Sequence, residues 1–217
     1  MKKWAFVSDF DGTISDEDFY WIVINKYFSD GKELFRKWKE AEILDIDFLS
    51  QVFTSIHQEE NQIIEDILSI PIDQYVPTFI NHVQKSNGDF YILSAGTDYY
   101  INHIINKFNI SNVKVISNEG FYHEKNIHLK IDPNHKHYSQ RYGIDKSKVI
   151  QDLKKEYEIV HFIGDSEPDS HPAQYADLTF AKSALQSLLL EKDIPFVAVN
   201  NFKEVEQYLI QHGMMSL

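Results

Sequence analysis

A short apolar run that leads into two closely spaced carboxylates constrains this chain more than any other stretch. Residues 4–7 are all apolar, and Asp9 and Asp11 follow behind a single serine, with Gly12 directly after them. The apolar run predicts a short buried strand, and the glycine permits a sharp turn where that strand ends. Two carboxylates at a strand end can bind a hard cation, and one can act as a nucleophile while the other transfers a proton. For such a pair on its own, a solvated loop after a strand is the alternative interpretation.

Strand-like and helix-like patterns alternate over most of the remaining chain. Further strands are expected at 90–93, 113–116, 159–163, 178–181 and 196–199, with a β-hairpin from 120 to 131. Amphipathic helical patterns separate most of these runs. We therefore expect an α/β fold with a mostly parallel sheet and right-handed crossovers, in which sites form beyond the carboxyl ends of the strands.

Residues 16–78 break this alternation, because helical patterns follow one another there without a strand between them. A crossover between parallel strands normally needs only one helix. We therefore expect residues 1–15 and 79–217 to form the core, and residues 16–78 to form a small helical-bundle cap over the loop of the first strand. The alternative is that these helices simply cover one face of the sheet.

The bulk composition excludes several classes of function. The chain has 217 residues and a formal net charge of -12, with no basic tract, so we expect no nucleic-acid partner. It contains no cysteine, which removes disulfides and thiolate chemistry and suits a reducing cytoplasm. No apolar stretch has the character of a signal peptide or a membrane span, so we expect a cytoplasmic protein without a membrane partner. No helix shows a clear exposed seam, and both a monomer and a homodimer are compatible with the pattern.

Three predicted strand ends carry groups that suit phosphoryl transfer. The first strand leads into the aspartate pair, residues 90–93 lead into Ser94, and residues 159–163 lead into Asp165. A parallel sheet brings these ends to one edge. Carboxylates there can hold Mg²⁺, while a hydroxyl group, backbone amides and a lysine can hold phosphate oxygens.

Taken in order, these motifs resemble those of a known superfamily. They are Asp9-Phe10-Asp11-Gly12-Thr13, Ser94-Ala95-Gly96, Lys146 and Gly164-Asp165-Ser166-x-x-Asp169. The chain is similar to the haloacid dehalogenase-like phosphatases, and its helical insertion resembles the cap of the phosphoserine-phosphatase-like branch, subfamily IB. Within that branch it looks closest to the methionine-salvage phosphatases that act on 2-hydroxy-3-keto-5-methylthiopentenyl-1-phosphate. The resemblance implies a three-layer Rossmann-like core, a helical cap and Mg²⁺-dependent phosphatase activity.

The same resemblance implies roles for the acidic residues. Asp9 would be the nucleophile and a Mg²⁺ ligand. Asp11 would be the general acid and base, with its main-chain carbonyl on the metal. Asp165 would be the other direct protein ligand, and Asp169 a ligand or a support for one. Apart from these implied roles, its hydroxyl group at the turn makes Thr13 a candidate positioning residue.

The resemblance also implies a phosphate-binding set. Ser94 would bind the phosphate, together with the amides near Ala95 and Gly96. Lys146 would neutralise the phosphate charge, because its spacing to the last motif fits the superfamily better than that of Lys148, which is the alternative.

Two regions of the chain differ from the family pattern. Phosphoserine phosphatases hold the amino and carboxylate groups of the substrate with a cap glutamate and a cap arginine. Glu17 and Asp18 lie near the corresponding place here, and Arg36 is the only arginine of the predicted cap, so these three residues are candidate substrate contacts. Some salvage phosphatases carry a cysteine cluster before the motif lysine, where this chain instead has His123, His128, His135 and His137. These histidines are interpreted either as exposed loop residues or as a zinc site.

The sequence therefore predicts a phosphatase that hydrolyses a small phosphorylated metabolite through an aspartyl-phosphate. A methionine-salvage enol or diketone phosphate and a phosphoserine-like compound are the candidate substrates. Two alternatives stay open. The phosphoryl group could pass to another acceptor, as in a phosphotransferase or mutase, or the chain could be a non-catalytic receiver-like protein, since receiver domains also combine acidic strand ends with a lysine.

Overall fold

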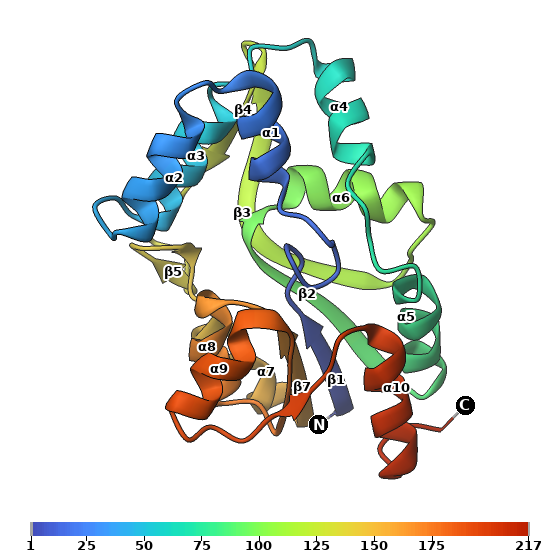
Figure 1. Cartoon of the computed structure of the whole chain (residues 1–217). Coiled ribbons are helices and arrows are strands. Elements are labelled where there is room, and N and C mark those ends of the chain that lie inside the picture. Colours follow the sequence, from blue (N-terminus) through green and yellow to red (C-terminus); the bar gives the residue numbers. More distant parts are fainter. Residues whose placement is uncertain (1, 217) are drawn as a thin grey trace.

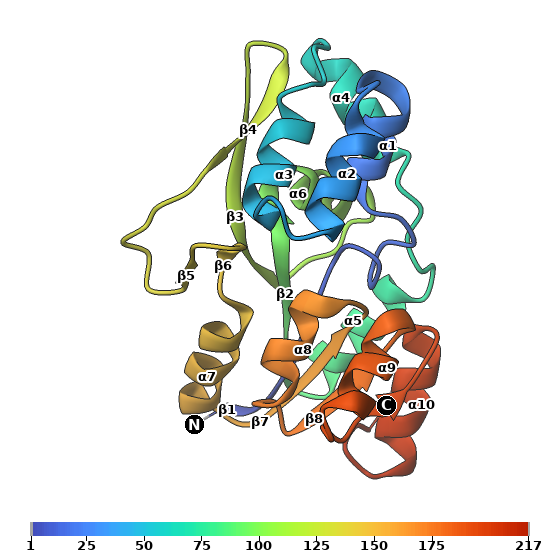
Figure 2. The ribbon, with the colours of Figure 1, turned by 60° about the vertical axis from the view of Figure 1, so that its left-hand side comes forward.

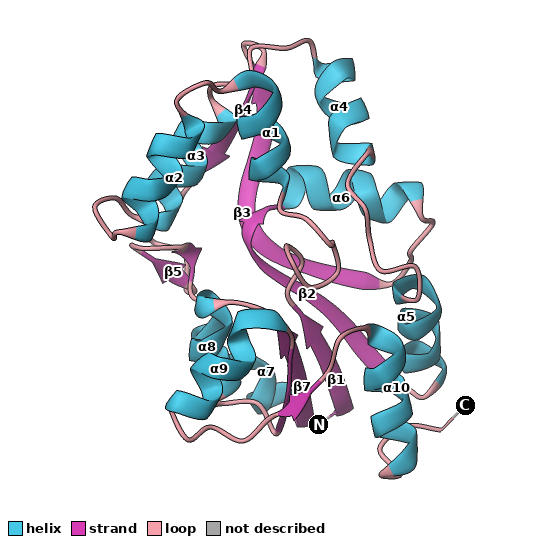
Figure 3. Cartoon of the chain, in the orientation of Figure 1, coloured by secondary structure: helices cyan, strands magenta, loops and turns pink. Residues whose placement is uncertain are grey.

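The computed structural model describes residues 2–216 and shows a sheet flanked by helices beneath a helical cap (Figures 1 and 3). The strands are β1 (Lys2–Ser8), β2 (Gly88–Thr97), β3 (Val113–His123), β4 (Asn126–Lys130), β5 (Tyr138–Ser139), β6 (Gly143–Ile144), β7 (Tyr157–Gly164), β8 (Leu178–Ala181) and β9 (Val197–Ala198). The helices are α1 (Phe19–Tyr27), α2 (Gly31–Lys39), α3 (Asp45–Phe53), α4 (Glu60–Leu68), α5 (Val76–Lys85), α6 (Asp98–Lys107), α7 (Lys146–Glu156), α8 (Glu167–Ala173), α9 (Ser183–Glu191) and α10 (Phe202–Gln211). Within the described residues, none of the helices has the length and apolar character that a membrane span requires.

The main sheet has the strand order β4-β3-β2-β1-β7-β8-β9. Every neighbouring pair in it is parallel except β3 and β4. The first strand of the chain therefore lies in the middle, between β2 and β7. This arrangement confirms the predicted α/β fold with a mostly parallel sheet.

Alternation along β1 sends side chains to two separate apolar layers. Phe6 is fully buried on one face, among apolar residues of α5 and α10 such as Phe79 and Phe202. Ala5 and Val7 pack on the other face, against the apolar side of α7. Helices therefore cover both faces of the sheet (Figure 2), as a three-layer core requires.

The cap consists of α1 to α4 and lies above the carboxyl ends of the central strands (Figure 1). Aromatic side chains fill its interior, and Trp38 stacks on Phe48 with 4.4 Å between ring centroids. An antiparallel bridge between Ser15 and Ile72 joins the two segments that connect cap and core. Helix α5 packs against β2 and α10, and it begins before the predicted boundary at residue 79. The division into core and cap remains a proposal. We place its second boundary close to Ile72, where the bridge lies, and not at residue 79.

The β3–β4 hairpin also supports the cap. The sequence predicted a short strand and a separate hairpin, whereas β3 is continuous and carries β4 upward beside α3 (Figures 1 and 2). The amide of His57 donates to Oδ1 of Asn126 at 3.0 Å, and the amide of Gln58 donates to the carbonyl of Lys125 at 2.9 Å. The cap therefore contacts the core sheet through this hairpin as well as through its two connecting segments.

The segment predicted as a loop at 132–142 is partly ordered by a small antiparallel pair, β5 and β6. The tight turn between them brings Arg141 to the cap, where its carbonyl accepts a hydrogen bond from the amide of Ile46 at 3.0 Å. This turn therefore forms part of the boundary between core and cap.

Candidate active site

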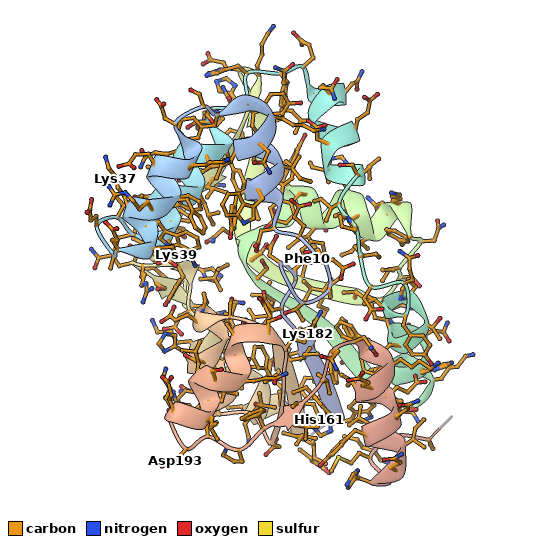
Figure 4. All side chains as sticks on the ribbon, in the orientation of Figure 1. Phe10, Lys37, Lys39, His161, Lys182 and Asp193 are labelled. Atoms are coloured by element: carbon orange, nitrogen blue, oxygen red, sulfur yellow. The ribbon has the colours of Figure 1, made fainter. Side chains whose placement is uncertain are left out.

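The carboxyl ends of β1, β2 and β7 meet beneath the cap. The amide of Asp9 donates to the carbonyl of Ile163 at 3.0 Å, which continues the pairing of β1 with β7. Asp9, Ser94 and Asp169 are all buried there. In Figure 4, the label of Phe10 marks this position between core and cap. The parallel topology thus brings the predicted motif residues to one place.

The turn after β1 depends on Gly12. Its φ of +74° lies in the left-handed region, and a Cβ atom there would lie 2.5 Å from Oδ2 of Asp165. Glycine adopts this conformation without strain and leaves the space free. The buried hydroxyl group of Thr13 donates from Oγ1 to Oδ1 of Asp165 at 3.2 Å. The turn therefore packs directly against Asp165.

Lys146 is the lysine that reaches the acidic cluster. Its buried Nζ lies 2.7 Å from Oδ1 of Asp9 and 2.7 Å from Oδ1 of Asp169. Lys148 is exposed, and its Nζ donates to the carbonyl of Tyr138 at 2.9 Å. Residues two apart on a helix do not share a face, so only one of the two lysines can point into the site.

Asp169 is enclosed, and both of its carboxylate oxygens have partners. Oδ1 accepts from Lys146 at 2.7 Å, and Oδ2 accepts from the amides of Asp165 and Ser166 at 3.0 and 3.2 Å. The last contact belongs to a capping box at the start of α8. Asp169 therefore holds Lys146 and the main chain of Asp165 in place, which favours a supporting role over direct metal ligation.

Asp11 has different neighbours from Asp9. Its Oδ2 accepts from Oγ of Ser94 at 3.2 Å and from the hydroxyl group of Tyr100 at 2.5 Å, and both donors are neutral. Burial raises the pKa of Asp11, although these two hydrogen bonds oppose that effect. One carboxylate thus contacts a lysine ammonium while the other is held by hydroxyl groups.

The acidic cluster carries more negative charge than its lysine offsets. Burial raises the pKa of Asp9 well above its usual value, and the charge of Asp169 adds to this in spite of Lys146. Burial and the charge of Asp169 also raise the pKa of Asp165, to about 7. The pKa of Lys146 is raised in turn, because the attraction of Asp169 and Asp9 outweighs the effect of burial. A further cation would relieve the remaining repulsion.

The donor atoms fit a hard divalent cation. Asp9, Asp165 and Asp169 each place a carboxylate oxygen within 4.8 Å of the others. Among the described residues, Oδ2 of Asp9 and Oδ2 of Asp165 receive no hydrogen bond, whereas both oxygens of Asp169 do. Carboxylate oxygens that are free to ligate in a buried acidic site are what Mg²⁺ and similar ions require.

A cavity of about 490 Å³ lies between this cluster and the cap. The core contributes the motif residues as its floor, and the cap contributes an apolar wall formed by Trp38, Leu49 and Phe53. Asp18 also faces the cavity, and burial together with the charge of Asp11 raises its pKa to about 7. The site therefore combines a charged floor with a patch of apolar surface from the cap.

Of the three predicted cap contacts, the structure brings only Asp18 to the cavity. Glu17 is half-buried outside the cavity lining. Arg36 is exposed and forms ion pairs with Glu33 and Glu40 on the solvated face of its own helix. The prediction that Arg36 reaches the substrate is therefore not supported by its position.

Sequence reasoning missed several cavity residues. Lys39 and Arg141 both line the cavity, as do Tyr20, Tyr142 and Glu167. Lys39 lies in the last turn of α2, where a basic residue ordinarily complements the helix dipole, so its position in the sequence carries no functional signal. Arg141 lies in the segment predicted as a loop. Both reach the site only through the packing of the cap on the core.

The histidines between 123 and 137 do not assemble a metal site. His123 and His128 lie on the β3–β4 hairpin with 5.7 Å between ring centroids, and His137 contacts Asp152 at 2.8 Å. Within residues 2–216 no histidine belongs to a group of three potential ligands. A zinc site in this region therefore has no support in the structure.

The fold and the site together define a haloacid dehalogenase-like phosphatase with a helical cap. A family model described as "Putative Phosphatase" matches residues 5–185, and the chain belongs to this family. A 2-hydroxy-3-keto-5-methylthiopentenyl-1-phosphate phosphatase of Bacillus pumilus is 30% identical over 194 residues, which cover 85% of this chain and 81% of that protein. The phosphatase of the same name from Bacillus cytotoxicus is 26% identical over 94% of both chains. The chain is thus a phosphoric monoester hydrolase related to the methionine-salvage phosphatases.

Solved structures share the fold. A phosphoserine phosphatase described as a phospho-aspartyl intermediate analogue matches with a TM-score of 0.70 and 14% identity, over 96% of this chain and 99% of that one. A cytosolic 5'-nucleotidase IIIB bound to cytidine matches with a TM-score of 0.66 and 16% identity, over 97% and 84% of the two chains. These similarities confirm the expected superfamily fold.

Proposed function

We propose that this protein is a Mg²⁺-dependent phosphatase that hydrolyses a small phosphorylated metabolite through an aspartyl-phosphate on Asp9. The observation that carries the proposal is the pair of unlike carboxylates at the end of β1. Asp9 lies beside the Lys146 ammonium, whereas Asp11 lies beside the hydroxyl groups of Ser94 and Tyr100, and both face the same cavity.

In the first half of the reaction, a carboxylate oxygen of Asp9 attacks phosphorus and the bond from phosphorus to the ester oxygen breaks. Asp11 donates its proton to the departing oxygen, so that a neutral alcohol or enol leaves. Lys146 and the hydroxyl group of Ser94, with the amides of Ala95 and Gly96, bind the phosphate oxygens and offset their charge.

In the second half, water attacks the phosphorus of the aspartyl-phosphate. Asp11 is now ionised and accepts a proton from that water, which releases inorganic phosphate and restores Asp9. The elevated pKa of Asp11 suits a group that must gain and lose a proton in each cycle.

The metal would be held by the free carboxylate oxygens of Asp9 and Asp165, with the main-chain carbonyl of Asp11. Asp169 would support these ligands through Lys146 and the amide of Asp165. Bound Mg²⁺ supplies positive charge that offsets the repulsion between the phosphate and the carboxylates.

The cavity wall favours a methionine-salvage enol or diketone phosphate over phosphoserine. Trp38, Leu49 and Phe53 offer apolar surface to the part of the substrate that extends from the phosphate. Arg36, the cap arginine expected to hold the carboxylate of phosphoserine, is turned to solvent. The names of the relatives support the same choice.

Phosphate release from p-nitrophenyl phosphate tests the nucleophile and the metal. We expect Asp9→Asn to abolish turnover while its circular dichroism matches the wild type, and we expect chelation by EDTA to abolish turnover until Mg²⁺ is restored. Asp16→Asn is a matched control, because Asp16 is exposed in the connecting segment and should retain activity. Turnover by the Asp9 variant would overturn the assignment of Asp9 as the nucleophile. Full activity in EDTA would overturn the proposed dependence on a metal ion.

A substrate panel tests the finer assignment. We expect kcat/KM for the methylthioribose-derived enol phosphate to exceed that for phosphoserine, with p-nitrophenyl phosphate as the common reference. The reverse order would overturn the substrate choice and leave the reaction chemistry in place.

A further inference from the structure

Lys182 is a buried cation that the mechanism above does not use. The residue is 8% exposed and directly follows β8, and its Nζ donates to the main-chain carbonyl of Thr13 at 2.9 Å. Figure 4 labels Lys182 on the core side of the site, next to the turn that follows β1. Among the described residues it forms no ion pair with a carboxylate, although buried lysines usually do. The desolvated ammonium group therefore holds the turn after β1 through its hydrogen bond to the carbonyl of Thr13.

The contacts of Lys182 connect two of the strand ends that build the site. Thr13, whose carbonyl it holds, donates from Oγ1 to Oδ1 of Asp165 at 3.2 Å. The amide of Lys182 donates to the carbonyl of Gly164 at 2.9 Å, and the amide of Leu185 donates to the carbonyl of Asp165 at 2.8 Å. One short segment therefore holds the turn after β1, the end of β7 and the carboxylate of Asp165 in a fixed relation.

The backbone of this segment is itself strained. Ser183 has a φ of 45°, in the left-handed region that residues with a side chain rarely adopt. Such a conformation persists where the surrounding contacts over-determine it, and it is common near functional sites. Here it lets the chain turn from β8 into α9 while both the amide and the ammonium group of Lys182 keep their partners.

We propose that Lys182 is a positioning residue that sets the affinity of the acidic cluster for its divalent cation. It fixes the carbonyl of Thr13, and the Thr13 hydroxyl group then orients the carboxylate of Asp165 towards the metal. The inference rests on the proposed function, because it takes Asp9 and Asp165 as ligands. The cavity lining does not include Lys182, so the effect on substrate binding should be small.

Titration of Mg²⁺ into the substrate-free protein by calorimetry tests this role. We expect Lys182→Met, which keeps the aliphatic stem, to weaken Mg²⁺ binding by about 10- to 100-fold, as removal of a partner of a ligand does. The KM for p-nitrophenyl phosphate at saturating Mg²⁺ should stay near the wild-type value. Lys107→Met is the matched control, since Nζ of Lys107 also donates to a main-chain carbonyl, that of Leu68, far from the cluster. Its Mg²⁺ affinity should be unchanged.

A second variant identifies the route of the effect. Thr13→Val removes the hydroxyl group that contacts Asp165, and we expect it to weaken Mg²⁺ binding as Lys182→Met does. The double variant should have the same Mg²⁺ affinity as whichever single variant binds Mg²⁺ less tightly. Both changes interrupt one chain of contacts, so the second change should add no further loss. Additive losses would overturn this route.

The outcomes separate the inference from the proposed function. Equal Mg²⁺ affinity in the wild type and in folded Lys182→Met overturns the inference alone. Failure of the wild type to bind Mg²⁺ overturns the metal assignment and the inference together. Should Lys182→Met not fold, as judged by circular dichroism, wild-type affinity in folded Thr13→Val overturns the inference instead.

Discussion

Nε of Arg141 donates to Oδ2 of Asp45 at 2.7 Å, and this ion pair joins the core to the first residue of cap helix α3. The same guanidinium group lies 3.3 Å from Glu167 at the start of α8 and 4.7 Å above the ring of Tyr142. All four residues line the cavity. The ion pair therefore crosses the boundary between core and cap at the edge of the cavity.

The first prediction concerns this ion pair. Arg141→Met should lower the free energy of unfolding by about 1 kcal/mol, because the buried Asp45 loses its partner while the half-exposed guanidinium is already screened by solvent. It should also raise KM for the metabolite. Urea unfolding and steady-state kinetics check both effects. Arg36→Met, which removes only exposed pairs on α2, should stay within about 0.5 kcal/mol of the wild type, and an equal loss in both variants would contradict the prediction.

The second prediction concerns the turn after β1. Gly12→Ala should cost more than about 1 kcal/mol of stability and most of the activity, because the added Cβ would lie 2.5 Å from Oδ2 of Asp165 at a φ of +74°. Gly213→Ala separates the two causes, since Gly213 has a φ of +66° but no atom near its Cβ position. Thermal unfolding and phosphate release should show a smaller stability loss and normal activity in this control. Loss of activity in both variants would assign the effect to conformation rather than to contact with Asp165.

The third prediction separates the two carboxylates by their roles. Asp11→Asn should lower kcat for an alkyl phosphate by about 10²- to 10⁴-fold, because no acid protonates the leaving oxygen. With p-nitrophenyl phosphate, whose leaving group needs no proton, the variant should release a stoichiometric burst of nitrophenol and then stall as the aspartyl-phosphate. Rapid-mixing absorbance measurements detect the burst. A linear time course at the wild-type rate would remove Asp11 from the mechanism.

The fourth prediction concerns pH and a residue outside the site. His161 on β7 is buried against the rings of Trp4 and Phe6, and within residues 2–216 its Nδ1 has no hydrogen-bond partner. Burial lowers its pKa from 6.5 to about 4. Below pH 6.5 the unfolded chain binds a proton that the folded protein excludes, so stability falls as the pH decreases from about 6.5 towards 4, and above this range the residue has no pH-dependent effect.

His161→Phe measures that contribution. The loss of unfolding free energy between pH 7 and pH 5, obtained from urea titrations, should be about 2 kcal/mol smaller in the variant than in the wild type. The same loss in both proteins would show that His161 is protonated in the folded state.

The site residues that could be predicted from the sequence are those whose positions follow from the local apolar pattern and from the order of the strands in the sheet. Asp9, Ser94 and Asp165 each follow an apolar run, and parallel pairing of β1, β2 and β7 brings such positions together. Lys146 could be preferred over Lys148 by its spacing to the last motif. The structure adds the physical reason, because the two lysines point to different sides of α7.

The residues that sequence reasoning missed depend on contacts between distant segments. Arg36 and Arg141 are equally polar in the sequence, yet Arg36 contacts only its own helix and Arg141 contacts the cap. Lys182 belongs to no motif that could be recognised in the sequence, because a lysine after a short strand normally faces water. Its role depends on the carbonyl of Thr13, which lies 169 positions earlier in the chain.

The hairpin contacts at His57 and Gln58 have a consequence for protein engineering. The cap enters and leaves the core at the bridge between Ser15 and Ile72, so it resembles an insert that could be exchanged by two cuts in the chain. Part of its support, however, comes from Lys125 and Asn126 on a hairpin of the core sheet. A chimaera that transplants this cap onto a related core must therefore include the hairpin. Without it, the transplanted cap would lose the hydrogen bonds that His57 and Gln58 donate to Asn126 and Lys125.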